Sequence, residues 1–336
     1  MLDSLRIAPR PLLNVIQGRP ILAVFEVCLR CNSACGYCNL PLNVGRYEMT
    51  REEIRRVFTS LYEDGLRFVF VQGGEPLLRR DLPDILEDLI DMGFGLTLIT
   101  NGTRFTPELV VRLAMLPLNI SVSLDTLDRD RYRQIRGNDQ LRQVLAGIDL
   151  LDGFPGPKYL TCVVSEVNRA DVIDVVRFAR TYGFMPVVVA YHWRVEQYGK
   201  EDLLLQYDRQ AASRVFEQVL ESGLVPRGYY RNYLRDNVRW LNGGSLERCD
   251  AGRYSIAIDA SGNVAPCLAL THAGNLLESS LDQILARFDR EAIRRCSDHS
   301  SCNVMCSRIV GSTLRHPVSA LMTPTSVPSQ ESEAGW

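Results

Sequence analysis

Three cysteines near the N-terminus constrain this 336-residue chain more than any other feature: Cys31, Cys35 and Cys38, spaced four and then three residues apart. A cubane iron–sulfur cluster that is closed by protein takes four thiolates. Three thiolates in one loop can therefore hold four irons and leave one iron open to a substrate or cofactor. A zinc knuckle is the alternative, but zinc sites usually pair two C-x-x-C units, and no C-x-x-C pair follows directly downstream.

Composition places the chain among ordinary globular proteins, with 46% hydrophobic and 23% charged residues. No stretch approaches the roughly 20 apolar residues of a membrane span, and the N-terminus lacks an export pattern, so we expect a cytoplasmic protein without a membrane partner. A net charge of -2 argues against nucleic acid as a partner. Ten cysteines in such a chain indicate metal or redox use, because the cytosol keeps thiols reduced.

Short apolar runs alternate with amphipathic stretches, a pattern typical of repeated βα units around a parallel sheet. The pattern predicts six strands, at residues 21–27, 68–71, 95–100, 119–124, 159–164 and 186–191. Thr50 and Glu53 form a capping box before one helix, and Asp171 is a candidate cap for another. Six units predict an α/β fold, an open, partial (β/α)6 TIM-like barrel, with its site at the C-terminal strand ends.

The chain divides into four predicted parts. Residues 1–197 form the barrel, with its core at 20–191, and residues 198–247 form a helical bridge. Residues 248–310 form a cysteine-rich module in which alternation at 254–258 and a turn at 261–263 predict a hairpin. Residues 311–336, rich in proline, serine and threonine, are expected to be disordered.

Polar motifs follow the predicted strands. The second strand is followed by Gly73-Gly74-Glu75-Pro76, where glycine permits positive φ and close backbone approach. The remaining candidates are Thr100 and Asn101 after the third strand, Ser123 and Asp125 after the fourth, and Arg136 in Ile-Arg-Gly. These residue types also cap turns and helices, so each residue alone is weak evidence for a binding site. The stronger evidence is that all of them occur in this order after the cysteine triad.

Together, the cysteine triad and these motifs resemble the signature of the radical S-adenosylmethionine (radical SAM) superfamily over about residues 20–191. The resemblance implies that the triad holds a 4Fe-4S cluster whose open iron binds S-adenosylmethionine. Reductive cleavage of that cofactor would give a 5'-deoxyadenosyl radical that abstracts a substrate hydrogen. It also implies cofactor-binding roles for the strand-end residues Gly73, Gly74, Glu75, Pro76, Thr100, Asn101, Ser123, Asp125 and Arg136.

A second cysteine set, Cys249, Cys267, Cys296, Cys302 and Cys306, lies in the C-terminal module. Its spacing resembles the SPASM extension of radical SAM enzymes, which implies an auxiliary 4Fe-4S cluster. The family pattern has a further cysteine where this chain has Ile293, and another late cysteine that is absent. We therefore expect one auxiliary cluster, held by Cys249, Cys267 and two or so of the other three. A zinc site that includes His299 is the alternative.

Two cysteines remain. Cys28 ends the first strand and is interpreted as a buried small hydrophobe. Cys162 lies inside the fifth strand, where alternation allows it to face the barrel lumen and return a hydrogen atom to a substrate radical. A buried core position is the simpler interpretation, since free cysteine is among the most buried residue types.

Three functions remain open at this point. The first is radical chemistry on a small polar molecule such as a sugar, aminocyclitol or nucleoside, by oxidation, epimerisation or carbon–carbon bond formation in natural product biosynthesis. The second is maturation of a ribosomally synthesised precursor peptide. The third is a non-catalytic iron–sulfur electron carrier, which would not require Gly73 to Pro76. Either enzymatic function needs an electron donor of flavodoxin or ferredoxin type.

Overall fold

The computed structural model describes residues 10–192, 204–299 and 301–324. Nine strands form one sheet in the order β6-β5-β4-β3-β2-β1-β7-β8-β9. The first six strands pair with their neighbours in parallel, and each predicted strand is confirmed to within one residue at either end. They are β1 (Leu22–Glu26), β2 (Phe68–Gln72), β3 (Gly95–Thr100), β4 (Leu118–Ser123), β5 (Lys158–Val164) and β6 (Met185–Ala190).

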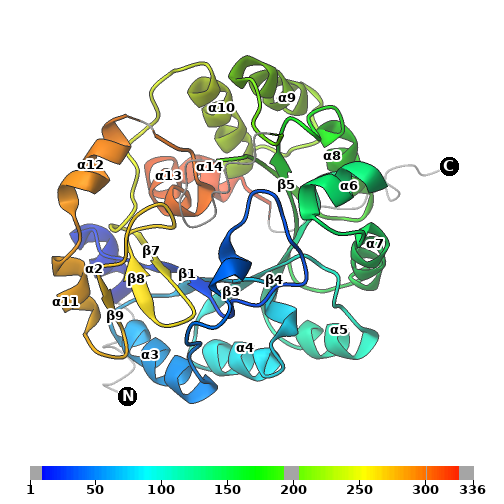
Figure 1. Cartoon of the computed structure of the whole chain (residues 1–336). Helices are drawn as coiled ribbons and strands as arrows, with labels where there is room; N and C mark the ends of the chain where they lie inside the picture. Colours follow the sequence, from blue (N-terminus) through cyan, green and yellow to red (C-terminus); the bar gives the residue numbers. More distant parts are fainter. Residues whose placement is uncertain (1–9, 193–203, 300, 325–336) are drawn as a thin grey trace.

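Helices surround the curved parallel sheet, which confirms the partial (β/α)6 barrel (Figure 1). They are α3 (Arg51–Glu63), α4 (Leu82–Asp91), α5 (Pro107–Ala114), α6 (Arg129–Arg136), α7 (Leu141–Leu150) and α8 (Val172–Thr181). The capping box of Thr50 and Glu53 at α3 is confirmed. Asp171 stands at the start of α8 but makes no side-chain cap. Its carboxylate instead accepts hydrogen bonds from Thr126 and Arg131, which compete with the helix for the same oxygens.

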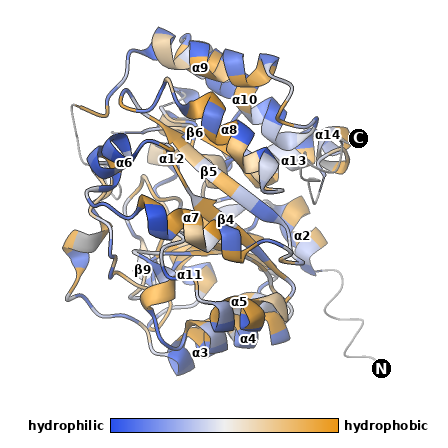
Figure 2. Ribbon diagram, turned by 90° about the vertical axis from the view of Figure 1, so that its right-hand side faces the viewer, coloured by the Kyte–Doolittle hydropathy of each residue, from blue (hydrophilic) through white to orange (hydrophobic). Residues whose placement is uncertain are grey.

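Alternation along the strands decides which side chains face the lumen. In β4, Ile120 and Val122 are buried in the main core beneath the helices, whereas Ser121 and Ser123 lie on the opposite face. In Figure 2 the strands are mostly hydrophobic, and the helices carry hydrophilic residues on part of their circumference. The lumen wall is therefore partly polar, while the outer face of the sheet is apolar.

The C-terminal module extends the barrel sheet instead of forming a sheet of its own. The predicted hairpin is confirmed as β7 (Ser255–Ile258) and β8 (Asn263–Ala265), which pair antiparallel, followed by β9 (Gly274–Asn275). β7 also pairs in parallel with β1, in register from Leu22 and Ser255. The first barrel strand, β1, thus pairs with the barrel strand β2 along one edge and with β7 of the cysteine-rich module along the other.

Further helices complete the fold. The predicted bridge contains α9 (Arg209–Glu221) and α10 (Tyr229–Leu241), which pack against each other. The remaining helices are α2 (Arg10–Gln17), α11 (Leu281–Ala286), α12 (Arg290–Asp298), α13 (Ile309–Arg315) and α14 (Pro317–Leu321), with 3-10 helices η1 (Leu40–Asn43), η2 (Pro76–Leu78) and η3 (Met305–Ser307).

The expected disorder from residue 311 onward is wrong as far as residue 321, where α13 and α14 form. Arg315 pairs with Asp250 at 2.9 Å and with Glu247 at 3.0 Å. Thr323 accepts a hydrogen bond from the backbone N–H of Tyr229 at 2.8 Å. These long-range contacts order a segment whose composition alone predicts a tail.

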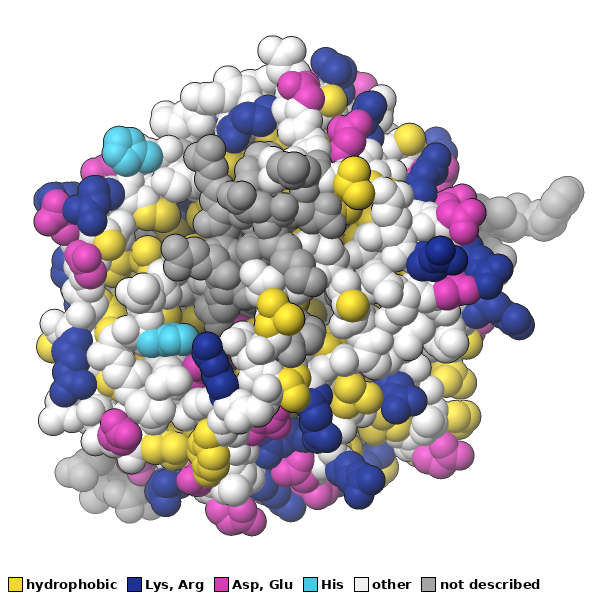
Figure 3. Space-filling view, in the orientation of Figure 1, with side chains coloured by type: hydrophobic (Ala, Val, Ile, Leu, Met, Phe, Trp, Pro, Cys, Tyr) yellow, Lys and Arg dark blue, Asp and Glu magenta, His cyan; other side chains and the backbone are white. Residues whose placement is uncertain are grey.

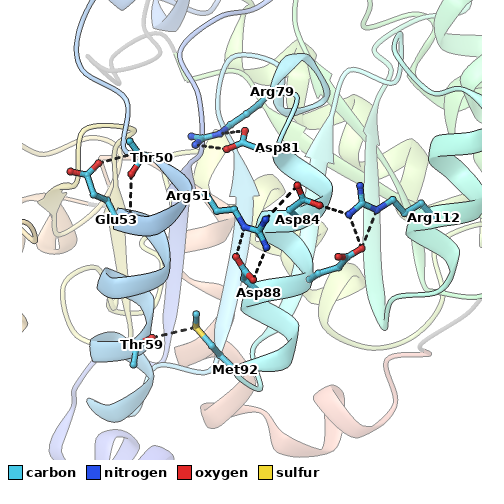
Figure 4. A network of polar contacts seen from close by, with 11 residues as sticks. Thr50, Arg51, Glu53, Thr59, Arg79, Asp81, Asp84, Asp88, Met92 and Arg112 are labelled. Carbon is cyan, nitrogen blue, oxygen red and sulfur yellow. Dashed lines mark hydrogen bonds and ion pairs between the residues drawn. The ribbon is translucent and has the colours of Figure 1, made fainter.

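Ion pairs tie the outer helices together on the solvent side (Figure 4). Arg51 of α3 pairs with Asp88 of α4 at 2.6 Å, and Arg112 of α5 pairs with Glu87 of α4 at 2.9 Å. On the face shown in Figure 3, charged side chains gather around the periphery, and the described atoms nearer the centre are mainly uncharged. Among the described residues, we find no helix whose length and apolarity would suit it to crossing a membrane.

Candidate functional site

The predicted triad lies in the loop that follows β1 and crosses the C-terminal ends of the strands (Figure 1). Its three thiols lie close together: charge repulsion from Cys35 raises the pKa of both Cys31 and Cys38, and Cys31 also raises that of Cys38. Burial is the larger effect and raises the pKa of Cys31 to about 11 and that of Cys38 to about 12. A buried site that gathers three thiols in this way favours a metal cluster, which displaces the thiol protons when it binds.

Gly73 and Gly74 hold the start of this loop by backbone contact. The N–H of Gly74 donates to the carbonyl of Cys28, and the N–H of Glu75 donates to that of Arg30, both at 2.8 Å. A Cβ on Gly74 would lie 2.2 Å from the Arg30 carbonyl oxygen, and one on Gly73, where φ is 147°, would lie 2.4 Å from that of Cys28. Glycine is therefore required at both positions by the close approach of two chains.

The Glu75 carboxylate is fully buried and joins the ends of two strands. It accepts hydrogen bonds from the Thr100 hydroxyl at 2.6 Å, the Asn101 N–H at 2.7 Å and the Leu77 N–H at 3.0 Å, where Pro76 opens η2. Burial raises the pKa of Glu75 even though these donors oppose the shift. Its visible role is to fix the loop after β3 against the loop after β2.

Asn101 holds the middle of the cysteine loop. Its side-chain amide donates to the Asn32 side chain at 2.8 Å, and its own oxygen accepts from the hydroxyl of Thr103 at 2.7 Å. Asn138 adds a hydrogen bond of 2.6 Å to the Asn32 carbonyl. The loop between Cys31 and Cys35 is thus anchored by side chains that follow β3 and α6.

Arg136 and Asp125 form a buried ion pair beside the triad. The Arg136 Nε lies 2.8 Å from Asp125 Oδ2, and the side chains are only 6% and 0% exposed. Asp125 also accepts from the Val163 N–H at 2.8 Å and from the Tyr37 hydroxyl at 3.2 Å. Arg136 Nη1 lies 4.0 Å from the sulfur of Cys35, while Nη2 is buried with no hydrogen-bond partner among the described residues.

Backbone hydrogen bonds at Ile135 and Arg136 also hold the cysteine loop in place. The Arg136 carbonyl accepts from the Ala34 N–H at 3.0 Å, and the Ile135 carbonyl accepts from that of Gly36 at 2.9 Å. Gly137 ends α6 with φ of 72°, and a Cβ there would lie 2.3 Å from the Ala34 carbonyl oxygen. The Ile-Arg-Gly element therefore positions the triad through its main chain and places one guanidinium group next to it.

Arg79 is a site residue that sequence reasoning missed. It donates to the Val27 carbonyl at 2.7 Å and to the Met49 carbonyl at 2.9 Å, and it pairs with Asp81 at 2.8 Å. Figure 4 shows Arg79 and Asp81 facing each other next to the α3–α4 ion pairs. Because residues 27 and 49 flank the cysteine loop, the Arg79 side chain joins the two ends of that loop. The only signal in the sequence is an arginine three residues after Pro76.

The second cysteine set surrounds a small hollow in the module. Its walls include Cys249, Cys267, Cys296 and Cys302, and Ile293 stands in the same wall. Cys306 lies close to Cys249 and Cys267, and it also packs against the lumen-side cluster that contains Leu22 and Val24.

The chemistry of this donor set fits a cluster. Cys296 accepts a hydrogen bond from the Cys302 thiol, which lowers the pKa of Cys296. Four thiols, those of Cys249, Cys267, Cys296 and Cys302, line one hollow. His299 is exposed and does not line it. A hollow walled by soft sulfur ligands suits an iron–sulfur cluster.

A buried arginine accompanies this set as well. Arg308 is 7% exposed and donates to the carbonyls of Glu247 at 2.7 Å and Cys302 at 3.2 Å. Its Nε has no partner, and it makes no ion pair with any carboxylate in the described part of the chain. An unpaired buried cation is costly unless a nearby anion compensates it. Negatively charged sulfur ligands around a cluster would supply that anion.

The remaining candidates have mixed outcomes. Ser123 lies half-buried at the lumen end of β4, and Cys28 is buried as predicted. The core interpretation of Cys162 is confirmed and its lumen-facing alternative is wrong: the residue is buried with Leu160 and Val164 on the helix-facing side of β5. Its thiol donates to the Asp125 carbonyl at 3.6 Å. The lumen face of β5 carries Thr161, which bonds Ser121 of β4 at 2.9 Å.

Comparison with known families gives two matches. The model described as the radical SAM superfamily matches residues 25–179. The model described as an iron–sulfur cluster-binding domain, SPASM, matches residues 249–307. The two matches cover the barrel with its triad and the module with its second cysteine set, and they imply two 4Fe-4S clusters and S-adenosylmethionine as cofactors.

Curated relatives match about half of this chain. A probable GTP 3',8-cyclase of Pyrococcus abyssi is 34% identical over 166 residues, which is 48% of this chain and 54% of the relative. An AdoMet-dependent heme synthase of Methanosarcina barkeri is 30% identical over 177 residues, 52% of this chain and 50% of the relative. The chain thus spans about half the length of these relatives.

Solved structures extend the likeness to the module. SuiB of Streptococcus suis bound to the precursor peptide SuiA has a TM-score of 0.67 at 18% identity, covering 86% of this chain and 70% of that one. The structure of anSMEcpe with bound AdoMet has a TM-score of 0.63 at 16% identity, covering 86% and 84%. At these identities the likeness establishes the fold.

Proposed function

Because the chain belongs to the radical SAM superfamily and carries a SPASM domain, we propose that it abstracts a hydrogen atom from a small polar substrate. When bound, the cluster and S-adenosylmethionine would supply a 5'-deoxyadenosyl radical by reductive cleavage. The proposal rests on one observation, which is that the cysteine loop is held in place at the C-terminal ends of the strands. Residues 73–76, Thr100 with Asn101, the Ile-Arg-Gly element and Arg79 hold it, and together they form a clamp. An electron carrier would need the thiols but not this clamp.

Individual residues take defined parts in the proposal. Cys31, Cys35 and Cys38 would hold the first cluster. Arg136, with one buried nitrogen free of hydrogen bonds, would receive the carboxylate of the cofactor. Main-chain carbonyls at Gly73 and Gly74 would accept from its ammonium, since the Glu75 carboxylate is already engaged by three donors.

The second set would hold one auxiliary cluster. Cys249 and Cys267 would supply two ligands, and two of Cys296, Cys302 and Cys306 would supply the others. Where the family pattern has a further cysteine, this chain has Ile293, which lies in the wall of the hollow. The missing ligand supports one auxiliary cluster and not two.

The lumen and its mouth support a small polar substrate. Lumen-facing side chains of β3, β4 and β5 include Thr97, Asn119, Ser121 and Thr161. A cleft of about 580 Å³ opens between the cysteine loop and the residues that follow Cys267. Its lining combines Glu26, Arg46 and His272 with apolar residues, and its size lies in the usual range for ligand sites. Hydroxyl and amide groups in a lumen favour a substrate rich in hydrogen-bonding groups.

The experiment measures 5'-deoxyadenosine in the anaerobically reconstituted protein with dithionite and S-adenosylmethionine. We expect slow formation without substrate, faster formation with the true substrate, and none in the C31A/C35A/C38A variant. Absence of 5'-deoxyadenosine from a protein with full iron content would overturn the proposal. Candidate sugars, aminocyclitols and nucleosides would then be compared by the acceleration that each one gives.

Maturation of a ribosomally synthesised peptide is the second candidate. The likeness to SuiB, solved with its precursor peptide, covers the C-terminal module as well as the barrel, and this favours it. A precursor peptide encoded next to this gene would accelerate 5'-deoxyadenosine formation and change mass, whereas small polar molecules would do neither. In either case we place the protein in the cytoplasm with an electron donor of flavodoxin or ferredoxin type.

A further inference from the structure

A positively charged cleft lies on the outer side of the second cysteine set. It has a volume of about 520 Å³ and is bounded by the end of α2, the segment around residues 248–253 and α12. Four arginines line it: Arg248, Arg253, Arg290 and Arg294. We refer to it as the arginine cleft.

These arginines lack partners of opposite charge. None of the four has a carboxylate oxygen within 4.0 Å in the described part of the chain. Arg253 stacks over the ring of Tyr254 at 4.6 Å, while Arg248, Arg290 and Arg294 are exposed. Four like charges around one cleft produce a local positive potential that attracts an anionic partner.

The cleft and the cysteine hollow share a wall. Cys249, Ala251 and Ile293 line both of them. On the other side of the set, Cys306 packs against the lumen-side cluster that includes Leu22 and Val24. The second cysteine set therefore spans the distance between the arginine cleft at the surface and the wall of the barrel lumen.

We propose that the arginine cleft is the docking site of an acidic electron-transfer protein of the flavodoxin or ferredoxin type. This rests on the proposed function, because only a bound cluster gives the partner something to reduce. One electron passes from the partner's reduced flavin or iron–sulfur centre to the cluster held by the second cysteine set. The partner is oxidised by one electron, the cluster is reduced by one, and no bond forms or breaks.

The arrangement fits a protein better than a small anion. A site for phosphate places buried donors around one point, but three of these arginines are exposed on the rim. The one buried hydroxyl in the lining, that of Ser297, already accepts a hydrogen bond from the Cys249 N–H at 2.9 Å. Asp298 also lines the cleft, and a small polyanion would meet this carboxylate directly. A protein surface can spread its acidic side chains over the rim and avoid it.

The test compares two double variants with the same change in charge. R290E/R294E reverses two arginines of the cleft, and R142E/R214E reverses two exposed arginines of α7 and α9. Binding of a fluorescently labelled acidic flavodoxin and of a plant-type ferredoxin is measured by anisotropy on the reconstituted protein, at low and high salt. We expect R290E/R294E to weaken binding about tenfold or more, R142E/R214E to stay within about twofold, and salt to weaken wild-type binding.

Three outcomes would overturn the docking proposal. They are unchanged binding in R290E/R294E, equal loss in both variants, and displacement of the carrier by millimolar inorganic phosphate or a short DNA duplex, which would indicate a small-anion or nucleic-acid site. Dithionite-driven formation of 5'-deoxyadenosine is the separate readout of the proposed function. We expect both double variants to retain it, and its absence in the wild type would reject the proposed function without deciding where a carrier docks.

Discussion

The guanidinium group of Arg79 donates a hydrogen bond of 2.7 Å to the carbonyl oxygen of Val27. The same group reaches the Met49 carbonyl at 2.9 Å, so the two ends of the cysteine loop are joined through one side chain. Because the Arg79 side chain is only 9% exposed, water cannot readily replace these bonds when it is removed.

We predict that R79M destabilises the loop. Hydrogen bonds to charged groups contribute about 1.5–3 kcal/mol each, so the unfolding free energy should fall by about 2–4 kcal/mol and the iron content should decrease. Urea denaturation and iron analysis provide the measurement. R51M is the matched control, since the ion pairs of Arg51 in Figure 4 are exposed to solvent and contribute little to stability. Equal effects in the two variants would contradict the assigned role of Arg79.

A methyl group at Gly74 should prevent assembly of the triad. It would collide with the Arg30 carbonyl at 2.2 Å, and backbone cannot move aside as a flexible side chain can. We expect G74A to lose at least about 3 kcal/mol of stability, the upper range for an overpacked site, together with most of the first cluster. G153A is the control, because Gly153 has φ of 71° but no neighbour within 4 Å. It should lose only about 1 kcal/mol.

Iron analysis should separate the two cysteine sets. With two cubanes, the reconstituted wild type should hold about eight irons per chain, and C31A/C35A/C38A should hold about four. Sulfide content should follow the same ratio. About four irons in the wild type would contradict the expectation of two clusters.

Arg308 should set the reduction potential of the auxiliary cluster. Loss of its buried charge in R308M favours the less negative, oxidised state, so the potential should fall by on the order of 50–100 mV. R308K should restore part of the shift, and R294M, which removes an exposed and solvent-screened charge, should cause little. Potentiometric titration followed by electron paramagnetic resonance gives the values. Equal shifts in R308M and R308K would show that packing, not charge, is responsible.

His192 should make stability depend on pH below neutrality. Burial lowers the pKa of its imidazole to about 4, from 6.5 in an unperturbed histidine. Below pH 6.5 the unfolded chain takes up a proton that the folded chain does not, so stability is lost as pH falls from about 6.5 to 4, by up to about 3 kcal/mol. In H192Q this contribution should vanish. The difference in unfolding free energy between the two proteins at pH 7 and pH 5 measures it.

Strand positions could be predicted from sequence because apolar runs and capping signals are local. Thr50 and Glu53 form their cap within one turn, and each parallel strand contributes a row of buried apolar side chains. The site motifs were also found, but their contacts were not. Asn101, for example, holds Asn32 of the cysteine loop, which depends on two loops that only the fold brings together.

The failures have a similar origin. The buried core position favoured for Cys162 is correct, but the pattern alone did not show which face of β5 is the lumen, so the catalytic alternative stayed open. Asp171 stands at a helix start, yet Thr126 and Arg131 occupy its carboxylate. The helices after residue 308 are ordered by long-range partners such as Asp250 and Tyr229, which no local signal reveals.

The parallel pairing of β1 with β7 has a mechanical consequence. One continuous ladder of backbone hydrogen bonds leads from the strand that delivers the triad to the hairpin that delivers Cys267. The separation between the start of the triad loop and Cys267 is then set by the spacing of the sheet. Electron tunnelling falls steeply with distance, so a fixed span would give this enzyme the same transfer rate in every turnover, whatever substrate occupies the lumen.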